Sequence, residues 1–274
     1  MPVKTIGSVA IIKKYNNLHA TEAANNIINI FKKYGISVYS IPPLSIDGCT
    51  ILTKRDLKKI DMIIAIGGDG TTLRAFRTFP SDIPVFSINI GGNKGILSEI
   101  KATSLKEINN TIIRLIQGDF IIEDKLRIFP SINGKKYPPA LNDILIFRAN
   151  MTRTPLISVK FRSYEMKQRM DGLIISTPIG STGHSYSIGG PILHEDMDCI
   201  IISPIASVNK VPSLVIPSET IEIRSDDKIH FVIDGQETRM LNPDQILVIS
   251  KYSSYAKFIR LNNKDMRQLE KLGF

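Results

Sequence analysis

The apolar residues in the first part of the chain follow two alternating patterns. Short, almost continuous apolar runs at residues 8–13, 37–41, 61–66 and 85–90 predict buried strands. Apolar residues at helical spacing predict helices at 21–33, 73–77 and 104–117. Strands that alternate with helices are typical of an α/β fold with a parallel sheet. Gly118 follows the last of these helices and is suited to end it.

From residue 119 onward the pattern changes to short strands separated by turn residues. These predicted strands cover residues 121–128, 136–137, 140–147, 156–161, 173–175, 221–223, 229–233 and 246–249. We therefore predict two domains, an α/β domain of residues 1–118 and a β-rich domain of residues 119–255. The last stretch, residues 257–274, has a helix-forming tail that could pack on either domain.

The composition is that of a globular protein and does not by itself identify a function. The 274 residues are 43% hydrophobic and 22% charged, and 35 Lys and Arg stand against 26 Asp and Glu, which gives a net charge of +9. No apolar run approaches the roughly 20 residues that cross a bilayer, which indicates a soluble protein. The first residues do not resemble a secretion signal, and Cys49 and Cys199 show neither metal-binding nor disulfide spacing. We therefore expect a cytoplasmic protein.

The most informative local feature is a glycine-rich turn after a predicted buried strand. In IDMIIAIGGDGTTLRAF, Gly67, Gly68 and Gly70 surround Asp69, and Thr71 leads into a predicted helix. The glycines let the backbone approach a ligand closely, and N–H groups at a helix N-terminus attract a phosphate. An acid beside phosphates fits a base that accepts a proton from an attacking hydroxyl, or a metal ligand. The alternative is an ordinary tight turn with Thr71 as the helix cap.

Two further segments carry polar side chains that suit a nucleoside. Asn142 and Asp143 precede an apolar strand, and an amide beside a carboxylate suits the vicinal hydroxyls of a ribose, although such a pair is often only a turn. In DGLIISTPIGSTGHSYSIGGPI, residues 171–192, a buried strand breaks into a turn rich in Ser, Thr and Gly before a short helix. Hydroxyl and N–H groups gather there, although a capped helix would explain the same residues.

Taken in this order, the three segments are similar to those of the NAD kinase family, which phosphorylates the 2'-hydroxyl of the adenosine ribose of NAD to give NADP. GGDGT is shared with lipid kinases and 6-phosphofructokinases, whereas STPIGST at residues 176–182 narrows the resemblance to NAD kinases. The similarity extends through VFSINIGGNKGILSE at 85–99, Asp234-Gly235-Gln236 and the final LEKLGF. It implies an α/β domain followed by a β-rich domain, a site between them, and a final segment, 256–274, that returns to the first domain.

The resemblance also implies roles for individual residues. Asp69 would be the catalytic base, and Gly67, Gly68 and Thr71 would form the phosphate loop. The residues expected to bind NAD are Gly70, Arg74, Asn142, Asp143, Arg153, Arg169, Asp171, Thr182, Gly183, His184, Ser185, Tyr186, Ser187 and Gln236. ATP would be the donor and would bring a divalent metal ion such as Mg, for which the chain itself shows no ligand spacing. The family resemblance further implies a homodimer or homotetramer.

Four residues depart from the family pattern: Ile179 replaces a hydroxyl residue, Ile96 replaces a Phe, and the other two are expected NAD contacts. Asp143 stands where the family has Glu, and its reach is roughly 1.5 Å shorter, a gap that a water could bridge. His184 stands where the family has Tyr, and an imidazole can still stack on a base, with less area and a pH-sensitive charge. We expect these changes to alter the affinity for NAD.

Other functions make different demands on the sequence. A lipid or sugar kinase of the same superfamily would have no STPxGST segment. A non-catalytic nucleotide sensor would keep the glycines but would not need an acid at position 69. An RNA-binding module would combine basic with aromatic residues, but aromatic residues make up only 7% of the chain and do not cluster with Lys or Arg. We therefore expect neither a nucleic-acid nor a membrane partner.

Overall fold

The protein consists of two compact units, each with its own hydrophobic core. The computed structural model describes residues 6–41, 46–53, 55–78, 82–90, 95–102, 104–264 and 267–273. Unit 1 lies within Met1–Asp124 and Lys257–Phe274, and unit 2 is Lys125–Ala256. Residues 91–94 of the glycine-rich stretch at 85–99, and Phe274 at the end of LEKLGF, lie outside the described residues.

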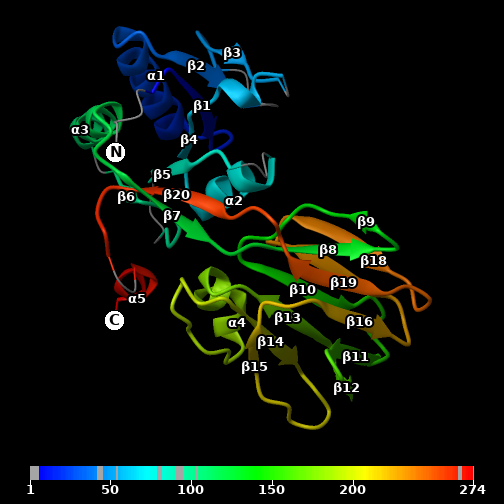
Figure 1. Cartoon of the computed structure of the whole chain (residues 1–274). Helices are drawn as coiled ribbons and strands as arrows, with labels where there is room; N and C mark the ends of the chain where they lie inside the picture. Colours follow the sequence, from blue (N-terminus) through cyan, green and yellow to red (C-terminus); the bar gives the residue numbers. More distant parts are fainter. Residues whose placement is uncertain are drawn as a thin grey trace. The chain divides into compact units, whose positions relative to one another are not determined.

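Unit 1 is built on a parallel sheet with helices against it (Figure 1). Its strands are β1 Ser8–Lys13, β2 Ser37–Ser40, β3 Thr50–Ile51, β4 Met62–Ile66, β5 Val85–Asn89, β6 Ile100–Lys101, β7 Ile121–Lys125 and β20 Ala256–Arg260. They lie in the order β3-β2-β1-β4-β5-β20-β7, and β6 also pairs with β5. All neighbours from β3 to β5 are parallel, as are β6 and β20 to β5. The predicted α/β fold is confirmed.

The helices of unit 1 carry apolar residues at helical spacing, and two of them begin after a polar cap. They are α1 Leu18–Lys33, α2 Asp69–Thr78, α3 Leu105–Ile116 and α5 Arg267–Leu272, with a short 3-10 turn, η1, at Leu57–Lys59. Asn17 caps α1 by accepting the Ala20 N–H at 2.8 Å. Helices α1 and α3 bury their apolar residues against one face of the central strands, and α2 lies against β4 and β5 (Figure 1). The ordinary amphipathic pattern therefore explains these elements.

The carboxyl ends of β1 and β4 lie side by side at the point where the sheet order reverses. From β1 the chain continues outward to β2 and β3, whereas from β4 it continues to β5 on the other side. The Lys14 N–H, just after β1, donates to the Ile66 carbonyl at the end of β4 over 2.8 Å. In open α/β sheets, ligands bind in the crevice at such a switch point. The fold therefore places the glycine-rich turn where a ligand is expected.

The C-terminal segment contributes a strand as well as a helix to unit 1. β20 joins the sheet beside β5, and only α5 is helical in the described part of this segment. The prediction of a helix-forming tail from residue 257 is therefore right only for its end. Ala256, Phe258, Ile259 and Arg260 are all buried, because β20 lies inside the sheet. The predicted return of this segment to the first domain is confirmed.

Unit 2 consists of two six-stranded antiparallel sheets. The first has the order β15-β14-β13-β10-β17-β18 and the second the order β12-β11-β16-β19-β8-β9. Their strands are β8 Ile128–Ile132, β9 Lys135–Lys136, β10 Asp143–Arg148, β11 Leu156–Phe161, β12 Tyr164–Arg169, β13 Gly172–Ser176, β14 Cys199–Ile205, β15 Leu214–Pro217, β16 Ile221–Ser225, β17 Ile229–Ile233, β18 Glu237–Leu241 and β19 Leu247–Lys251. Isoleucines from both sheets fill the core, and the predicted β-rich domain is confirmed.

One predicted strand of the second half is divided in the structure. The apolar run at 121–128 forms the whole of β7 and the first residue of β8, and Leu126 and Arg127 separate the two strands. Arg127 is only 1% exposed, and its guanidinium donates to the Ser254 carbonyl at 2.9 Å and the Ser254 hydroxyl at 3.0 Å. This side chain fixes the chain where it enters unit 2, so the strand pairing changes there.

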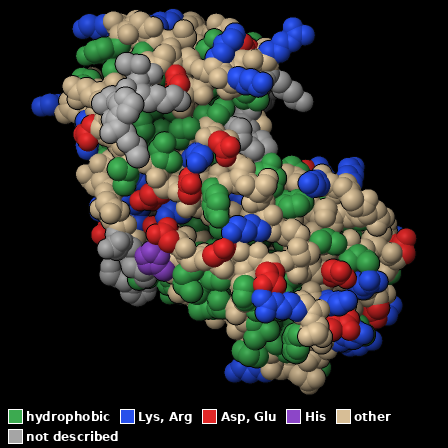
Figure 2. Space-filling view, viewed as in Figure 1, with side chains coloured by type: hydrophobic (Ala, Val, Ile, Leu, Met, Phe, Trp, Pro, Cys, Tyr) green, Lys and Arg blue, Asp and Glu red, His purple; other side chains and the backbone are tan. Residues whose placement is uncertain are grey.

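The charged residues are dispersed over the surface as they are along the sequence. Figure 2 shows Lys and Arg interspersed with Asp and Glu on the face in view. Exposed pairs of opposite charge, such as Arg153 with Asp226 and Lys264 with Glu270, contribute to this pattern. Within the described ranges, no helix is long and apolar enough to cross a membrane.

Candidate active site

The glycine-rich turn follows β4 directly, and only glycine fits at its first position. Gly67 has a φ of 154°, and a Cβ there would lie 2.4 Å from the Thr71 hydroxyl oxygen. Helix α2 begins at Asp69, four residues earlier than predicted, so Asp69 and Gly70 form its first turn. Thr71 is therefore inside the helix, and its interpretation as the helix cap is wrong. We call residues Gly67–Thr71 the phosphate loop.

The carboxylate of Asp69 is held by two backbone N–H groups. Its Oδ2 accepts the Ile96 N–H at 2.9 Å, and its Oδ1 accepts the Leu97 N–H at 3.0 Å. Both donors lie between β5 and β6, whereas Asp69 itself lies on α2. Two separate parts of unit 1 therefore fix the direction of this side chain. Hydrogen bonds from N–H groups favour the ionised carboxylate, which is the form that accepts a proton.

A cavity of ≈ 400 Å³ opens beside the phosphate loop. It is lined by Lys14, Tyr15, Gly68, Gly70, Thr71 and Arg74. The Arg74 guanidinium donates to the Lys13 carbonyl at 2.6 Å and lies 4.1 Å from the centre of the Tyr15 ring, which fixes it at the cavity wall. Burial lowers the pKa of Arg74, but a guanidinium stays charged in proteins. The cavity thus combines two positive side chains with a helix N-terminus, which suits phosphate groups.

Lys14 and Tyr15 were not predicted as site residues. They directly follow β1, and the phosphate loop directly follows β4. The only indication of this part of the site in the sequence is a basic residue, Lys14, directly after the first predicted strand. It could be used only with the knowledge that β1 and β4 are neighbours in the sheet.

In unit 2, Asp234 organises the predicted ribose-binding segment. Its carboxylate accepts the N–H groups of Leu141 at 2.9 Å, Asn142 at 2.8 Å and Asp143 at 3.2 Å. Asp234 and Gly235 have positive φ values of 48° and 64°, and they form the tight turn between β17 and β18. In the sequence, Asp234 is part of the Asp234-Gly235-Gln236 motif of the family. The motif did not predict that Asp234 would hold the backbone of Asn142 and Asp143.

Asn142 and Asp143 both have polar groups in buried surroundings. Among the described residues the Asn142 Oδ1 atom is buried without a hydrogen-bond partner. Asp143 is 7% exposed, and burial, reinforced by the charge of Asp234, raises the pKa of its carboxyl to about 7. Near neutral pH the Asp143 carboxyl is therefore partly protonated and can donate as well as accept a hydrogen bond.

The STPIGST turn, residues 176–182, packs directly on Asn142. The Thr177 N–H donates to the Asn142 carbonyl at 2.9 Å, and the Thr177 hydroxyl donates to the Leu141 carbonyl at 2.5 Å. A Cβ at Gly180 would lie 2.0 Å from the Asn142 carbonyl oxygen, so only glycine allows this approach. The turn contains the 3-10 helix η2, Ile179–Thr182, and Thr182 at its end is buried. The structure thus brings Asn142, Asp143 and this turn together.

The helix that follows the turn divides its residues between surface and interior. In α4, His184–Ser187, the side chains of His184, Tyr186 and Ser187 are exposed, as is the preceding Gly183. Ser185 is fully buried, and its hydroxyl lies 2.9 Å from the hydroxyl of Ser203 on β14. Gln236, in the turn after β17, is exposed. The exposed members of the predicted group are therefore the ones accessible to a ligand, whereas Ser185 supports the helix from inside.

Three predicted NAD contacts lie elsewhere in unit 2. Asp171 pairs with Arg148 at 3.2 Å, at the end of β10 opposite to Asp143. Five residue steps along a strand separate these ends by roughly 17 Å. Arg153 and Arg169 are exposed, and each forms an ion pair with Asp226. The Nη2 atoms of Arg153 and Arg169 lie 3.1 and 3.7 Å from the Asp226 Oδ2. Within unit 2, these residues are not brought together with Asn142 and the STPIGST turn.

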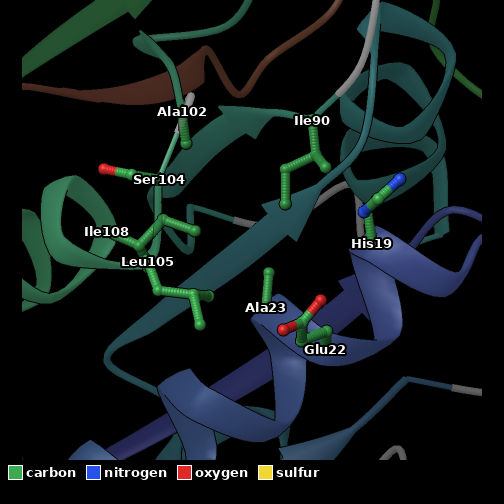
Figure 3. A pocket seen from close by; sticks show the side chains of 8 residues that line it. All are labelled: His19, Glu22, Ala23, Ile90, Ala102, Ser104, Leu105 and Ile108. Atoms are coloured by element: carbon green, nitrogen blue, oxygen red, sulfur yellow. The ribbon is translucent and has the colours of Figure 1, made fainter.

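A second cavity in unit 1 contains none of the predicted site residues. It measures ≈ 270 Å³ and lies beside the N-terminal ends of α1 and α3 (Figure 3). Its lining is mostly aliphatic, with His19, Glu22 and Ser104 as the polar members. In the described part of the chain, no three His, Cys, Asp or Glu residues are grouped in a way that could hold a metal ion.

The sequence matches family models in both halves. The ATP-NAD kinase N-terminal domain matches residues 50–120, and the ATP-NAD kinase C-terminal domain matches residues 141–261. The NAD kinase of Methanopyrus kandleri is 30% identical to this chain over 258 residues, which cover 92% of this chain and 91% of that protein.

Solved structures show the same fold. The crystal structure of yeast NADH kinase complexed with NADH gives a TM-score of 0.85 at 20% identity, over 98% of this chain and 86% of that chain. The crystal structure of an NAD kinase from Archaeoglobus fulgidus in complex with ATP gives a TM-score of 0.77 at 25% identity, over 97% and 96% of the two chains. With both family models matched and a relative of this similarity aligned over nearly its whole length, the chain belongs to the ATP-NAD kinase family.

Proposed function

We propose that this protein transfers the terminal phosphoryl group of ATP to the 2'-hydroxyl of the adenosine ribose of NAD, giving NADP. The observation that carries the proposal is Asp69, an acid in a glycine loop at the switch point of the sheet, with both carboxylate oxygens oriented by backbone N–H groups. A carboxylate in this place would serve as the base that accepts the proton of the attacking hydroxyl. Membership of the ATP-NAD kinase family supports the same reaction.

We assign the donor phosphates to the cavity beside the phosphate loop. Lys14 and Arg74 would neutralise their negative charge, and the N-terminus of α2 would add hydrogen-bond donors. A magnesium ion would come with ATP and neutralise charge on its phosphates, because Mg²⁺ is commonly held by substrate phosphates with one or two carboxylates. Asp69 is a carboxylate at the phosphate loop that suits such an arrangement.

We assign the acceptor nucleoside to the polar segments of unit 2. Asn142 and Asp143 would bind ribose hydroxyls, since Asn142 has a buried acceptor and Asp143 can donate as well as accept. The exposed ring of His184 would stack on a base, and Thr182 and Gln236 would complete the polar contacts. In this assignment unit 1 is the phosphate-donor and catalytic-loop domain, and unit 2 is the NAD-binding domain.

We further propose that the protein acts as a homodimer or homotetramer. Asp171 lies roughly 17 Å along the strand pair from Asp143. If Asp171 contacts NAD, as the family pattern implies, the contact would be to NAD held by another copy of the chain. Light scattering of the purified protein tests the assembly, and a monomer at assay concentration would contradict it. The free thiols of Cys49 and Cys199 suit the reducing cytoplasm, where we place the reaction.

The test is NADP formation by the purified protein from NAD, ATP and Mg, with NADH, other nucleoside triphosphates and polyphosphate in parallel. We expect NADP from the wild-type protein, and a loss of roughly 10²- to 10⁴-fold in turnover for Asp69→Asn with NAD binding retained. The amide keeps the size of the side chain but cannot accept the proton. No product with any donor would refute the function, whereas near-normal turnover of Asp69→Asn would refute only the role of the base.

A further inference from the structure

The direction of the Asp69 carboxylate depends on where the backbone of Ile96 and Leu97 lies. The Ile96 N–H donates to the Asp69 Oδ2 at 2.9 Å, and the Leu97 N–H donates to the Asp69 Oδ1 at 3.0 Å. Neither donor lies on α2, which carries Asp69. Whatever fixes the segment of residues 95–99 therefore also fixes the carboxylate. We call these residues the anchor segment.

Leu97 is held on its carbonyl side as well as its N–H side. Its carbonyl accepts the Ser87 hydroxyl of β5 at 3.1 Å and the Arg260 Nη1–H of β20 at 3.3 Å. Two residues further on, the Glu99 N–H donates to the Ser87 carbonyl at 2.9 Å. The anchor segment is thus fixed against β5 by Ser87 and from the C-terminal strand by Arg260.

Arg260 belongs to a buried group of alternating charges. The Glu99 Oε2 atom forms ion pairs with Arg260 and Arg267, at 3.2 Å each. The other carboxylate oxygen of Glu99 accepts the Leu261 N–H at 3.0 Å. The carboxylate of Glu123 in β7 accepts the Arg260 Nε–H at 3.2 Å. The side chains of Arg260, Glu99 and Arg267 are 1%, 4% and 4% exposed. Buried charges hold their geometry strongly, because separating any one of them leaves another without compensation.

Arg260 also connects to the helix that carries Asp69. Its guanidinium lies 4.5 Å from the centre of the Phe258 ring, and the Phe258 ring lies 4.7 Å from the ring of Phe76 in α2. The same side chain therefore contacts the anchor segment by a hydrogen bond and α2 through two aromatic rings. Both parts that meet at Asp69 pack against the C-terminal strand.

We propose that Arg260, held by Glu99, is a positioning residue for phosphoryl transfer: it fixes Leu97 and thereby orients the Asp69 carboxylate. The proposal rests on the proposed role of Asp69 as the base. It gives the C-terminal segment a part in turnover and not only in stability. A displaced carboxylate would lower the rate of the chemical step, because a shift of about 1 Å in a catalytic group can cost on the order of 10²-fold. Binding of NAD and ATP would change little, since Arg260 touches neither proposed ligand region.

The test uses two variants of the network and one matched control. Arg260→Lys keeps the positive charge but loses the planar fork that reaches Leu97, Glu99 and Glu123 together. Ser87→Ala removes the other donor to the Leu97 carbonyl and leaves the buried charges intact. Lys257→Met, on the same strand, removes the exposed pair with Asp124 and does not touch the anchor segment. Each is also made in the Asp69→Asn background.

We expect Arg260→Lys to lower kcat about 10- to 100-fold and Ser87→Ala less, with KM for NAD and ATP within about twofold of wild type. In the Asp69→Asn background, neither change should lower the remaining rate further, because the group through which they act is gone. Any loss of stability that Arg260→Lys or Ser87→Ala causes, measured as a lower urea midpoint, should persist in the Asp69→Asn background. Lys257→Met should keep wild-type turnover.

The double substitution separates positioning from simple loss of stability. An equal fall in rate with and without the Asp69 carboxylate would overturn the proposal, as would wild-type turnover of both Arg260→Lys and Ser87→Ala. If Arg260→Lys does not fold, Ser87→Ala alone decides by the same comparison. Failure of the proposed function is distinguishable, since the wild-type protein would then give no NADP. A fully active Asp69→Asn variant would overturn both the base and its positioning.

Discussion

Replacing Asp143 by Asn should stabilise the protein at neutral and alkaline pH. Asp143 is 7% exposed, and burial together with the charge of Asp234 raises the pKa of its carboxyl from 3.8 to about 7. In the unfolded chain this carboxyl ionises near pH 3.8, whereas in the folded protein it keeps its proton up to about pH 7. Between these values the folded state binds more protons, so stability falls as the pH rises and then stays at the lower level.

The magnitude follows from the size of the pKa difference. Each unit is worth 1.36 kcal/mol, so a shift from 3.8 to about 7 corresponds to a cost of about 4 kcal/mol once the carboxyl is ionised in both states. This value is an upper limit for the gain in Asp143→Asn, because the amide must still find hydrogen bonds in the same place. The gain should be full above pH 7, fall through the range from pH 7 to 4, and vanish below pH 4.

Urea unfolding at pH 4, 5, 6, 7 and 8 measures this dependence. Asp244→Asn, at an exposed position of the same unit, controls for the loss of one negative charge. The decisive quantity is the difference in free energy of unfolding between Asp143→Asn and wild type, plotted against pH. A difference that does not grow from pH 4 to 8, or a variant less stable than wild type at pH 8, would refute the reasoning from burial and like charge.

Substitutions at Gly180, Arg74 and His184 test the proposed site. Gly180→Ala places a Cβ 2.0 Å from the Asn142 carbonyl and should destabilise the protein by about 1–3 kcal/mol and weaken NAD binding, whereas Gly183→Ala, with a nearest contact of 3.2 Å, should change the urea midpoint little; equal midpoints would contradict this packing. Arg74→Gln should raise KM for ATP about tenfold with the Kd for NAD unchanged, and an effect confined to NAD would reverse our assignment of the cavity. His184→Ala should weaken NAD binding by about 1–3 kcal/mol in isothermal titration and His184→Tyr should restore it, whereas an unchanged Kd in the Ala variant would remove His184 from the site.

The fold could be predicted where apolar spacing alone decides the element. The strand at Ser8–Lys13 and the strands at Leu156–Phe161 and Ile229–Ile233 have the predicted bounds, because their burial follows a simple pattern. The C-terminal strand could not be read in this way. Residues 256–260 read AKFIR, with two basic residues, and Arg260 is buried only because Glu99 and Glu123 come to it from other parts of the chain.

The site could be predicted where chemistry depends on adjacent residues. The glycines around Asp69 and the STPIGST turn are local motifs, so their residue types indicate phosphate and hydroxyl chemistry without a fold. The start of α2 was misplaced because glycine has a low helix propensity, and the packing of α2 against β4 and β5 outweighs it at Gly70. Lys14 and Tyr15 join the same cavity only through the pairing of β1 with β4.

The surroundings of Asp69 and Asp143 could not be predicted from the sequence for a related reason. Asp234 holds the N–H of Asp143 across 91 residues of sequence, and Arg260 reaches the carbonyl of Leu97 across 163. In both cases a charged side chain far along the chain sets the geometry or the ionisation of a polar group that a motif had indicated. A motif therefore predicts which group reacts, whereas its proton affinity and direction are decided by residues with no motif of their own. This division explains why Asp69 was found from the sequence and its proposed control by Arg260 was not.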